Sequence, residues 1–292
     1  MLKTTTNQRP VLETHLVLGR VSNLPTVWSN CLAGWILGGG GAVATLAVLV
    51  LGASCLYLGG MYLNDAFDAE FDRLHRRERP IPSGHITLDR VWGWGFAWLG
   101  TGTVLLVSLG NSTAAVAALL LFCIVLYDAL HKLIAFAPVL MAACRFLLYL
   151  VAASVGRDGV TGLAVWCGLA LAVYIVGLSY LARHERSKSA LPYWPAALLA
   201  APILLALLVN TGMHRLPTSI LAVLVGLWIL RSLQPALAAE ELNVGRAVGD
   251  LLAGIVLVDL LALGGGAGLG LCLVLLALFL AALAFQRYIP AT

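Results

Sequence analysis

Long stretches without charge dominate the chain, and their lengths predict helices that cross a membrane. No Asp, Glu, Lys or Arg occurs between Arg20 and Asp65, or between Arg90 and Asp128. Because a spanning helix needs about 20 mostly apolar residues, each stretch is long enough for two helices. The turns that divide the two stretches are predicted at residues 38–41 and 110–112.

Six further apolar segments continue this pattern towards the C-terminal end. They predict a bundle of nine or ten helices, and the count stays open because only Gly264–Gly266 separates the last two segments. The chain has no internal repeat, linker or low-complexity tract, so residues 1–292 are expected to form a single all-α, multi-spanning domain. The six segments cover residues 134–154, 160–182, 192–210, 216–233, 247–263 and 267–286.

Composition and charge support a protein dissolved in the lipid bilayer and argue against one that binds nucleic acid. Hydrophobic residues make up 61% of the chain and charged residues 11%, whereas charged residues are about a quarter of a soluble domain. The formal charge of +4 reflects basic loops, which usually face the cytoplasm. We therefore expect an integral, multi-pass protein of a bacterial inner membrane. Its cytoplasmic segments would be residues 64–90, 128–134, 183–191 and 234–246, with the C-terminus.

An acidic cluster directly after the second predicted span is the strongest candidate for chemistry. If the helix continues through it, Asp65, Asp68 and Asp72 are three and four residues apart and share one face with Asn64. Like charges on one face repel, so the arrangement indicates a bound cation, and Mg²⁺ prefers such oxygen ligands together with phosphate. The alternative is a solvated helix whose acids pair with the arginines that follow. The position at the membrane edge favours the functional interpretation.

This segment resembles the first aspartate-rich motif of the UbiA superfamily, the intramembrane prenyltransferases. The resemblance implies a UbiA-like helical bundle in which the three aspartates are catalytic ligands of Mg²⁺ bound to an allylic diphosphate. Nearby basic residues would contact the phosphates. The residues that carry the resemblance are Asn64, Asp65, Asp68 and Asp72, followed by Arg76 and Arg79 in the basic stretch.

Two weaker similarities to the same family extend the candidate substrate site. Arg20 and Asn23 open the first span as in the family, where an asparagine faces the active cavity; the alternative is an interfacial arginine beside a helix-capping asparagine. Tyr127 and Lys132 resemble a tyrosine and lysine pair that lies near the diphosphate. The alternative here is an interfacial aromatic residue with a snorkelling lysine.

The loop after the sixth span departs from the family pattern, which places a second aspartate-rich motif there. The chain has Arg183-His184-Glu185-Arg186-Ser187-Lys188 instead, and only Glu185 offers an oxygen ligand for a second metal. Either the cations of this loop, including Arg183 and Lys188, neutralise the diphosphate, or the second metal site and the activity are lost. A third interpretation is an ordinary basic loop on the cytoplasmic side. The departure indicates a divergent branch, such as the Ebo-type UbiA-like proteins.

Two charged residues fall inside predicted spans, where a charge facing lipid is costly. Arg145 lies in the fifth span and Asp259 in the ninth, so both are expected to face the bundle interior. Asp259 is a possible partner of Arg145. A structural ion pair is favoured over a direct substrate role for either residue.

The sequence therefore predicts Mg²⁺-dependent transfer of a polyprenyl group from a polyprenyl diphosphate to a lipophilic, aromatic acceptor. Both substrates would occupy one cavity that opens to the bilayer. There are two alternatives. One is a membrane terpene cyclase, with the same fold and diphosphate site but no acceptor; the other, of a different functional class, is a non-catalytic carrier or scaffold for a lipophilic metabolite.

Overall fold

The computed structural model describes residues 10–183, 193–237 and 244–289, which are helical with no strand. The predicted all-α fold is therefore confirmed. The helices are α1 Val11–Leu18, α2 Leu24–Leu37, α3 Val43–Phe67, α4 Ala69–His75, α5 Leu88–Val107, α6 Asn111–Leu130, α7 Ala137–Ser154, α8 Gly162–Arg183, α9 Tyr193–Leu198, α10 Ala201–Val209, α11 Arg215–Leu237, α12 Val244–Leu263 and α13 Leu269–Gln286.

Seven helices in the described residues are long and apolar enough to cross a membrane, namely α3, α6, α7, α8, α11, α12 and α13. The other three predicted spans differ from this standard. The helix α2 has 14 residues, or about 21 Å, which is less than the roughly 30 Å hydrocarbon core. The helix α5 has the length, with 20 residues, but a lower apolar content. Seven of the ten predicted spans thus meet both criteria, length and apolar content, in the described residues.

The predicted span 192–210 is not one continuous helix, because the chain forms two short helices there, α9 and α10. Pro202 lies in the first turn of α10, and proline lacks the backbone N–H that would donate to the carbonyl group of Leu198. Its ring also clashes with that carbonyl group in a continuous helix. The helix α9 accordingly ends at Leu198, and α10 begins at Ala201.

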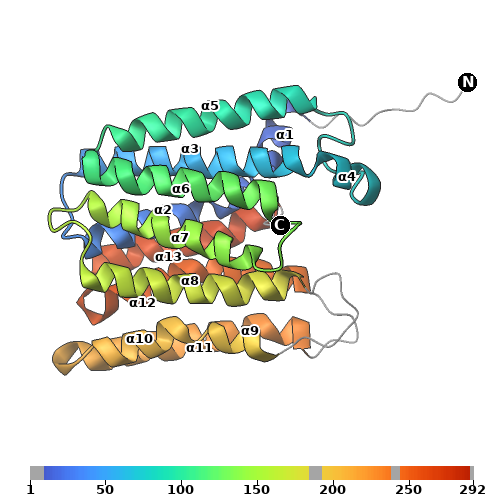
Figure 1. The fold of residues 1–292 in the computed structure, drawn as a ribbon. Coiled ribbons are helices and arrows are strands. Elements are labelled where there is room, and N and C mark those ends of the chain that lie inside the picture. Colours follow the sequence, from blue (N-terminus) through green and yellow to red (C-terminus); the bar gives the residue numbers. More distant parts are fainter. Residues whose placement is uncertain (1–9, 184–192, 238–243, 290–292) are drawn as a thin grey trace, which may run out of the picture.

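The long helices lie side by side with roughly parallel axes, and their connections gather at two ends (Figure 1). One end carries α4 and the α6–α7 connection; it is referred to below as the α4 end. The opposite end has tight turns, among them Gly39 and Gly40, whose positive φ values of 89° and 63° favour glycine. The predicted alternation of loops between two sides is therefore present in the described residues.

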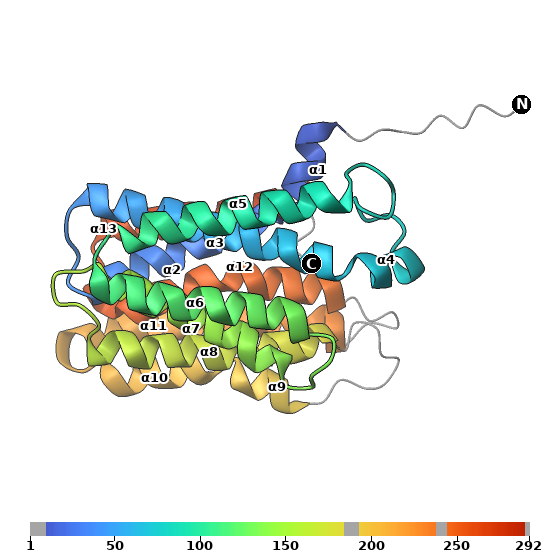
Figure 2. The same ribbon diagram turned by 45° about the horizontal axis from the view of Figure 1, so that its top comes forward.

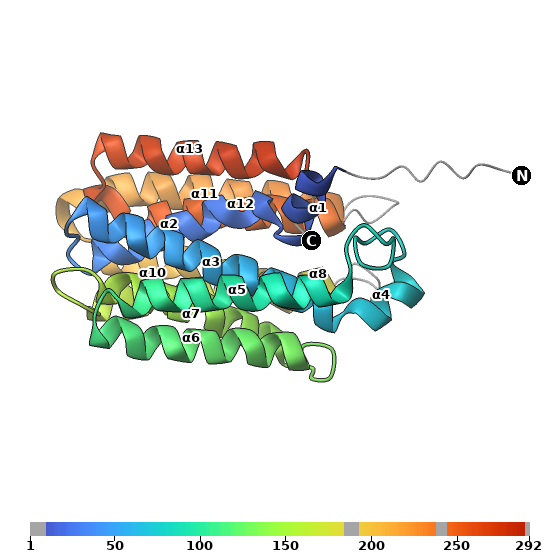
Figure 3. The same ribbon diagram turned by 90° about the horizontal axis from the view of Figure 1, so that it is seen from above.

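The views from other directions show how the helices are arranged in the bundle. The short helix α1 lies at the α4 end of the bundle, close to the start of α5 (Figure 2). Seen from above, α13 lies along one edge and α6 along the other, with α2 and α3 between them (Figure 3). The helices α2, α3, α6, α7, α8 and α12 enclose the cavity described below.

Close backbone contact between α3 and α5 fixes the position of the acidic segment. A Cβ atom at Gly102 of α5 would lie 2.7 Å from the carbonyl oxygen of Gly52 in α3. A Cβ atom at Gly59 would lie 2.9 Å from the backbone nitrogen of Leu99. Small residues allow such contact between helices in a membrane, where packing rather than exclusion of water drives association. The C-terminal end of α3, which carries the motif, is thereby held in one place.

Candidate active site

The acidic segment follows an almost continuous helical path from α3 into α4. The helix α3 ends at Phe67, and Asp68 links it to α4 with φ −82° and ψ −7°. The backbone N–H of Asp68 donates to the carbonyl oxygen of Asn64 (3.0 Å), and that of Asp72 to the carbonyl oxygen of Asp68 (2.9 Å). The predicted helix through the motif is therefore present, with one interruption at Asp68.

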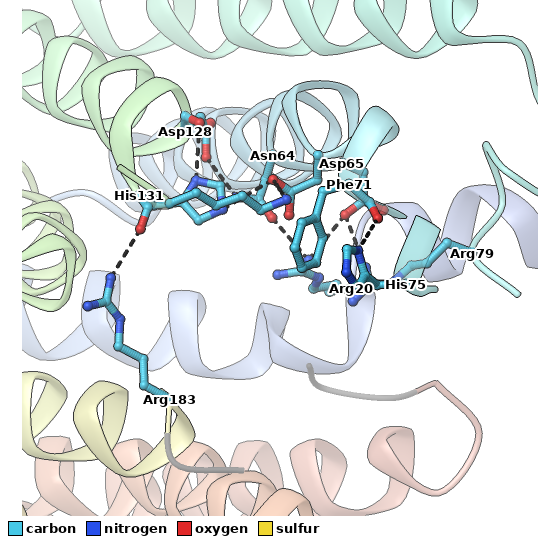
Figure 4. A network of polar contacts seen from close by, with 11 residues as sticks. Arg20, Asn64, Asp65, Phe71, His75, Arg79, Asp128, His131 and Arg183 are labelled. Carbon is cyan, nitrogen blue, oxygen red and sulfur yellow. Dashed lines mark hydrogen bonds and ion pairs between the residues drawn. The ribbon is translucent and has the colours of Figure 1, made fainter. Parts of the chain in front are cut away.

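Asp65 is bound by two arginines rather than facing the other acids. One carboxylate oxygen, Oδ1, lies 3.1 Å from Arg20 Nη2 and 3.1 Å from Arg79 Nη1, as Figure 4 shows. Arg20 Nη2 also donates to Asn64 Oδ1 at 3.1 Å. Two cations on one buried oxygen neutralise Asp65 and join the α1–α2 connection, α3 and the basic stretch into one unit.

Arg20 reaches this position through an unusual backbone conformation. Its φ of 41° is the only positive value at a non-glycine position in the described residues, and the left-handed region is costly for residues with a Cβ atom. The hydroxyl group of Tyr57 donates to its carbonyl oxygen at 3.2 Å. Such backbone strain concentrates at functional sites, which supports the predicted substrate role of Arg20.

Asp68 is bound by cations from the α6–α7 connection. Its Oδ1 lies 2.6 Å from Lys132 Nζ and 3.2 Å from His131 Nε2. Burial would raise the pKa of Asp68, but the hydrogen bonds from His131 and Lys132 outweigh it and hold the pKa below its usual value. Lys132 also lies 4.0 Å from the ring centre of Phe71, while the rings of Tyr127 and His131 stack.

Asp72 lies apart from these contacts. Its side chain is buried, and Oδ1 has no hydrogen-bond partner. Burial raises the pKa of this carboxyl group, despite the opposing effect of Arg79. The described residues contain no group of three or more His, Cys, Asp or Glu side chains placed to hold a metal ion. The three aspartates are thus neighbours along the helix but do not surround one point.

A cavity of about 490 Å³ opens beside these residues, within the range of small-molecule sites. Its mouth at the α4 end is polar, and its interior between α2, α3, α6, α7, α8 and α12 is apolar, with Val27, Leu56, Ile124, Leu148, Ile175 and Leu252 in its wall. Six Arg or Lys residues and two Asp residues line it, and this balance suits an anion. These charged residues are Arg20, Arg76, Arg79, Lys132, Arg145, Arg183, Asp68 and Asp128.

Most of the predicted site residues reach this cavity. The ones that line it are Arg20, Asn23, Asn64, Asp68, Arg76, Arg79, Tyr127, Lys132 and Arg183. Asp65 lies behind Arg20, and Asp72 is outside the lining. Glu185 and Lys188 lie outside the described residues, so their roles in binding the metal and the substrate stay predictions.

Arg183 makes contacts that its predicted role did not include. Its guanidinium group donates to the backbone carbonyl oxygens of Ala135 (2.7 Å), His131 (3.1 Å) and Ile134 (3.2 Å). These bonds fasten the end of α8 to the α6–α7 connection (Figure 4). Arg183 therefore positions the segment that presents His131 and Lys132 to Asp68.

Two residues that the sequence had not assigned belong to the site. His131 contacts Asp68, as described above. Asp128 is buried; its Oδ1 accepts a hydrogen bond from Asn64 Nδ2 at 3.4 Å, and its Oδ2 has no partner. Both could have been recognised, because Asp128 ends an uncharged span and His131 is one helical turn after Tyr127.

The donor groups at the mouth fit magnesium in kind. The side chains of Asn64, Asp68 and Asp128 bring amide and carboxylate oxygens to the cavity wall, and Mg²⁺ is commonly held by one or two carboxylates plus substrate phosphates. The buried Oδ2 of Asp128 also has no hydrogen-bond partner among the described residues, so it is free to contact a cation. The cavity thus has residues for a metal and for a phosphate group at the same end.

Deeper in the bundle, Arg145 and Asp259 belong to one buried network but form no direct ion pair. Arg145 donates to Asn30 Oδ1 (2.9 Å) and Thr26 Oγ1 (3.1 Å). Asp259 Oδ2 accepts hydrogen bonds from Ser29 Oγ (2.6 Å) and Asn30 Nδ2 (2.7 Å). The expected interior orientation of both residues is therefore correct, whereas the suggested pairing is indirect and passes through Asn30.

Proteins related in sequence point to one family. The model of the UbiA prenyltransferase family matches residues 23–241, well over half of the chain. A digeranylgeranylglyceryl phosphate synthase of Ignicoccus hospitalis is 36% identical over 108 residues, which cover 37% of this chain and 35% of that protein. The chain therefore spans about a third of the length of the curated relatives it matches.

Solved structures share the fold along almost the whole chain. One, from a study of digeranylgeranylglyceryl phosphate synthase in membranes, has a TM-score of 0.61 at 18% identity and covers 94% of this chain and 99% of that one. A UbiA homologue from Archaeoglobus fulgidus, bound to GPP and Mg²⁺, has a TM-score of 0.50 at 16% identity, with 94% and 97% covered. With the family match over residues 23–241, these findings show that the chain belongs to the UbiA prenyltransferase family.

Proposed function

We propose that this protein transfers a prenyl group from an allylic prenyl diphosphate to a lipophilic acceptor in a Mg²⁺-dependent reaction. The observation that carries the proposal is the cavity, which joins a cationic, oxygen-rich mouth to an apolar interior. An allylic diphosphate has the same division into a charged head and an apolar tail. The seven apolar helices and the family make the chain an integral, multi-pass membrane protein.

The diphosphate head would lie at the mouth of the cavity. Arg20, Arg76, Arg79 and Lys132 line this part, and guanidinium groups match phosphate oxygens with paired hydrogen bonds. Positive charge fixed there stabilises the charge that builds on the leaving diphosphate as the allylic carbon–oxygen bond breaks. The contacts of Arg20 and Arg79 with Asp65 hold two of these cations in place before substrate arrives.

Asp65 in α3, Asp68 between α3 and α4, and Asp72 in α4 are the proposed metal ligands. Glu185, which follows α8 in the sequence, is the proposed ligand of a second metal. When bound, Mg²⁺ supplies further charge neutralisation for the leaving group. The GPP and Mg²⁺ bound to the A. fulgidus homologue support this assignment. Lys132 must leave Asp68 Oδ1, at least in part, before a metal can use that oxygen, and the diphosphate offers Lys132 a new anionic partner.

The prenyl tail would extend into the apolar part of the cavity. Each buried methylene group contributes about 0.8 kcal/mol, so a long tail adds substantially to binding. Tyr57, Phe71 and Tyr127 line the cavity near its mouth, where aromatic faces can stabilise a developing allylic carbocation. The acceptor oxygen or carbon then attacks this cation, and the proton that it carries is released.

The identity of the acceptor has two candidates. The sequence led us to expect an aromatic acceptor. The relative named above is a digeranylgeranylglyceryl phosphate synthase, and that name describes a glyceryl phosphate with two geranylgeranyl groups, so a prenylated glyceryl phosphate is the second candidate. Direct competition between the two in a transfer assay decides between them.

The location of the active-site loops is also a proposal. Basic loops on one side of a multi-pass protein usually face the cytoplasm, which would place the α4 end there, in a bacterial inner membrane. Cysteine labelling of Arg77→Cys in intact cells tests this orientation. Protection from an impermeant reagent supports a cytoplasmic α4 end, and labelling excludes it.

The experiment for the proposed function is release of pyrophosphate from geranylgeranyl diphosphate by the purified protein, with and without Mg²⁺ and each candidate acceptor. Asp68→Asn is the test variant. Glu70→Gln is the matched control, because Glu70 is an exposed acid in the same segment. We expect metal-dependent release in the wild type and in the control, and its loss in Asp68→Asn.

The alternatives predict different results in the same experiment. A terpene cyclase would release pyrophosphate and form a cyclic hydrocarbon without an acceptor. A carrier or scaffold would bind a lipophilic compound without any turnover. If no allylic diphosphate binds with or without Mg²⁺, the transferase proposal is wrong.

A further inference from the structure

The cavity has a second cationic point, which is held by α7 and α2 rather than by the segments that form its mouth. Arg145 lies eight residues after the start of α7 at Ala137, which places its Cα atom about 12 Å further along the helix axis. Its side chain lines the cavity together with the apolar Val27 and Leu148. Arg145 thus lies in the wall of the cavity beside apolar residues.

The direct partners of Arg145 are neutral. It donates to Asn30 Oδ1 and Thr26 Oγ1, and no carboxylate within the described residues lies at ion-pair distance from it. A guanidinium group has five N–H donors in a planar fork, and these two hydrogen bonds leave other donors free for a ligand. The carboxylate of Asp259 is linked to Arg145 only through Asn30, so an anion in direct contact would stabilise the guanidinium group further in these apolar surroundings.

The network behind Arg145 holds it in position. Asn30 Nδ2 donates to Asp259, and this bond fixes the amide so that its oxygen faces Arg145. Ser29 donates to the same carboxylate oxygen. Asp259 is buried behind Asn30 and does not line the cavity, so it orients the guanidinium group without occupying its binding face.

A purely structural role for this pair would be met by direct contact, or by apolar residues, which are often at least as stable as a buried ion pair. The observed arrangement differs from both. Asn30 lies between the Asp259 carboxylate and Arg145. The guanidinium group is held by hydrogen bonds to neutral acceptors. In apolar surroundings, the attraction between a guanidinium group and an anion is stronger than in water.

We propose that Arg145 is the binding residue of a second anion subsite, which holds an oxyanion group of the acceptor, either a carboxylate or a phosphate. The inference rests on the proposed transferase function, because it assigns the inner cationic point to the second substrate. The mouth then binds the diphosphate, and Arg145 binds the acceptor head. The acceptor nucleophile would be held between them, near the allylic carbon.

Two pairs of probes, each an anion and its uncharged analogue, test this subsite by equilibrium binding without turnover. One pair is geranylgeranylglyceryl phosphate and geranylgeranylglycerol; the other is 4-hydroxybenzoate and 4-hydroxybenzamide. We expect the wild type to bind the anion of one pair at least about tenfold more tightly than its neutral analogue, as a charge-assisted hydrogen bond allows. The pair that shows the preference identifies the chemical source of the oxyanion.

The variants separate recognition from folding. In the double variant Arg145→Met with Asp259→Asn, both buried charges are removed together, which avoids an unpaired carboxylate, and the preference should fall to near one. Arg145→Lys keeps the positive charge but lacks the planar guanidinium group, and it should retain part of the preference for the anion. Arg157→Met removes an exposed guanidinium group at the opposite end from α4 and should leave the preference unchanged.

Binding of geranylgeranyl diphosphate, measured on the same samples, keeps the two proposals apart. If the wild type shows no preference in either pair, or the double variant retains it, the subsite is wrong even where the diphosphate binds. If the diphosphate fails to bind while the preference for an anion is present and depends on Arg145, the transferase function is wrong and the anion site stands.

Discussion

Lys132 Nζ lies 2.6 Å from Asp68 Oδ1, so a cation of the α6–α7 connection occupies an oxygen of the acid that we propose as a metal ligand at the junction of α3 and α4. A metal bound there would compete with this lysine for the same oxygen. A bound diphosphate would resolve the competition, because it is an anionic partner for both. Metal binding and diphosphate binding should therefore strengthen each other.

Substitution of Lys132 tests this competition. In Lys132→Met, Asp68 retains only His131, so Mn²⁺ used in place of Mg²⁺ should bind several-fold more tightly without diphosphate. The affinity for geranylgeranyl diphosphate should fall by about tenfold or more, since one charge-assisted hydrogen bond is lost. Electron paramagnetic resonance of free Mn²⁺ and a diphosphate binding assay measure the two effects. Arg77→Met, an exposed cation nearby, is the control; unchanged affinities in Lys132→Met would contradict the competition.

Asp65 is predicted to be more important for stability than for direct contact with substrate. Asp65→Asn leaves Arg20 and Arg79 facing each other without their common carboxylate, and breaking such a buried ion pair typically costs about 3 kcal/mol. The melting temperature in detergent should fall by several degrees, and added diphosphate should restore part of the loss. The control Glu70→Gln should melt as the wild type does. Equal melting temperatures for Asp65→Asn and wild type would refute the prediction.

Arg183 is predicted to act through the α6–α7 connection. Arg183→Lys keeps a positive charge but cannot donate to three carbonyl oxygens in the same way, so the amides of residues 131–136 should exchange hydrogen faster and transfer should slow severalfold. Hydrogen–deuterium exchange measures the first effect and pyrophosphate release the second. If transfer slows while exchange stays unchanged, Arg183 acts by contact with substrate instead.

Asp128 is predicted to lower the stability of the ligand-free protein. It is a buried carboxylate with one unpartnered oxygen, which is costly away from water. Asp128→Asn should raise the melting temperature by a few degrees and reduce prenyl transfer at least about tenfold, as expected where function and stability conflict. Full activity in this variant would show that Asp128 takes no part in the reaction.

The role of Glu185 can be tested although it lies outside the described residues. If the cations after α8 replace a second metal, Glu185→Gln should leave the Mg²⁺ dependence of transfer unchanged. A rise of tenfold or more in the Mg²⁺ concentration needed for half-maximal rate would show that Glu185 is a metal ligand. The comparison uses the same transfer assay with the wild type.

The sequence was sufficient to predict the fold, and most of the predicted site residues line one cavity. Gaps between charges located the ten apolar segments, whereas α1 was not predicted. The acidic motif lies at the end of the bundle where the cavity has its polar mouth. The division at Pro202 was missed because the apolar run continues on both sides of it. Side-chain pairing was also beyond the sequence: which cation meets Asp65 or Asp68 depends on how α1, α3 and the α6–α7 connection approach one another. The link between Arg145 and Asp259 passes through Asn30, a residue with no charge to draw attention to it.

The glycine contact between α3 and α5 has a consequence for the distant mouth of the cavity. Gly52 lies 12 residues before Asn64, about 18 Å along the helix axis. A methyl group at Gly102 would push against the Gly52 carbonyl oxygen and tilt α3, and a small tilt at this depth becomes a larger displacement at the motif. The distance between Asp68 and Lys132 should therefore depend on Gly52 and Gly102, which have no side chains and lie inside their helices. Substitutions at these two positions can change the geometry of the site without altering any residue that touches substrate.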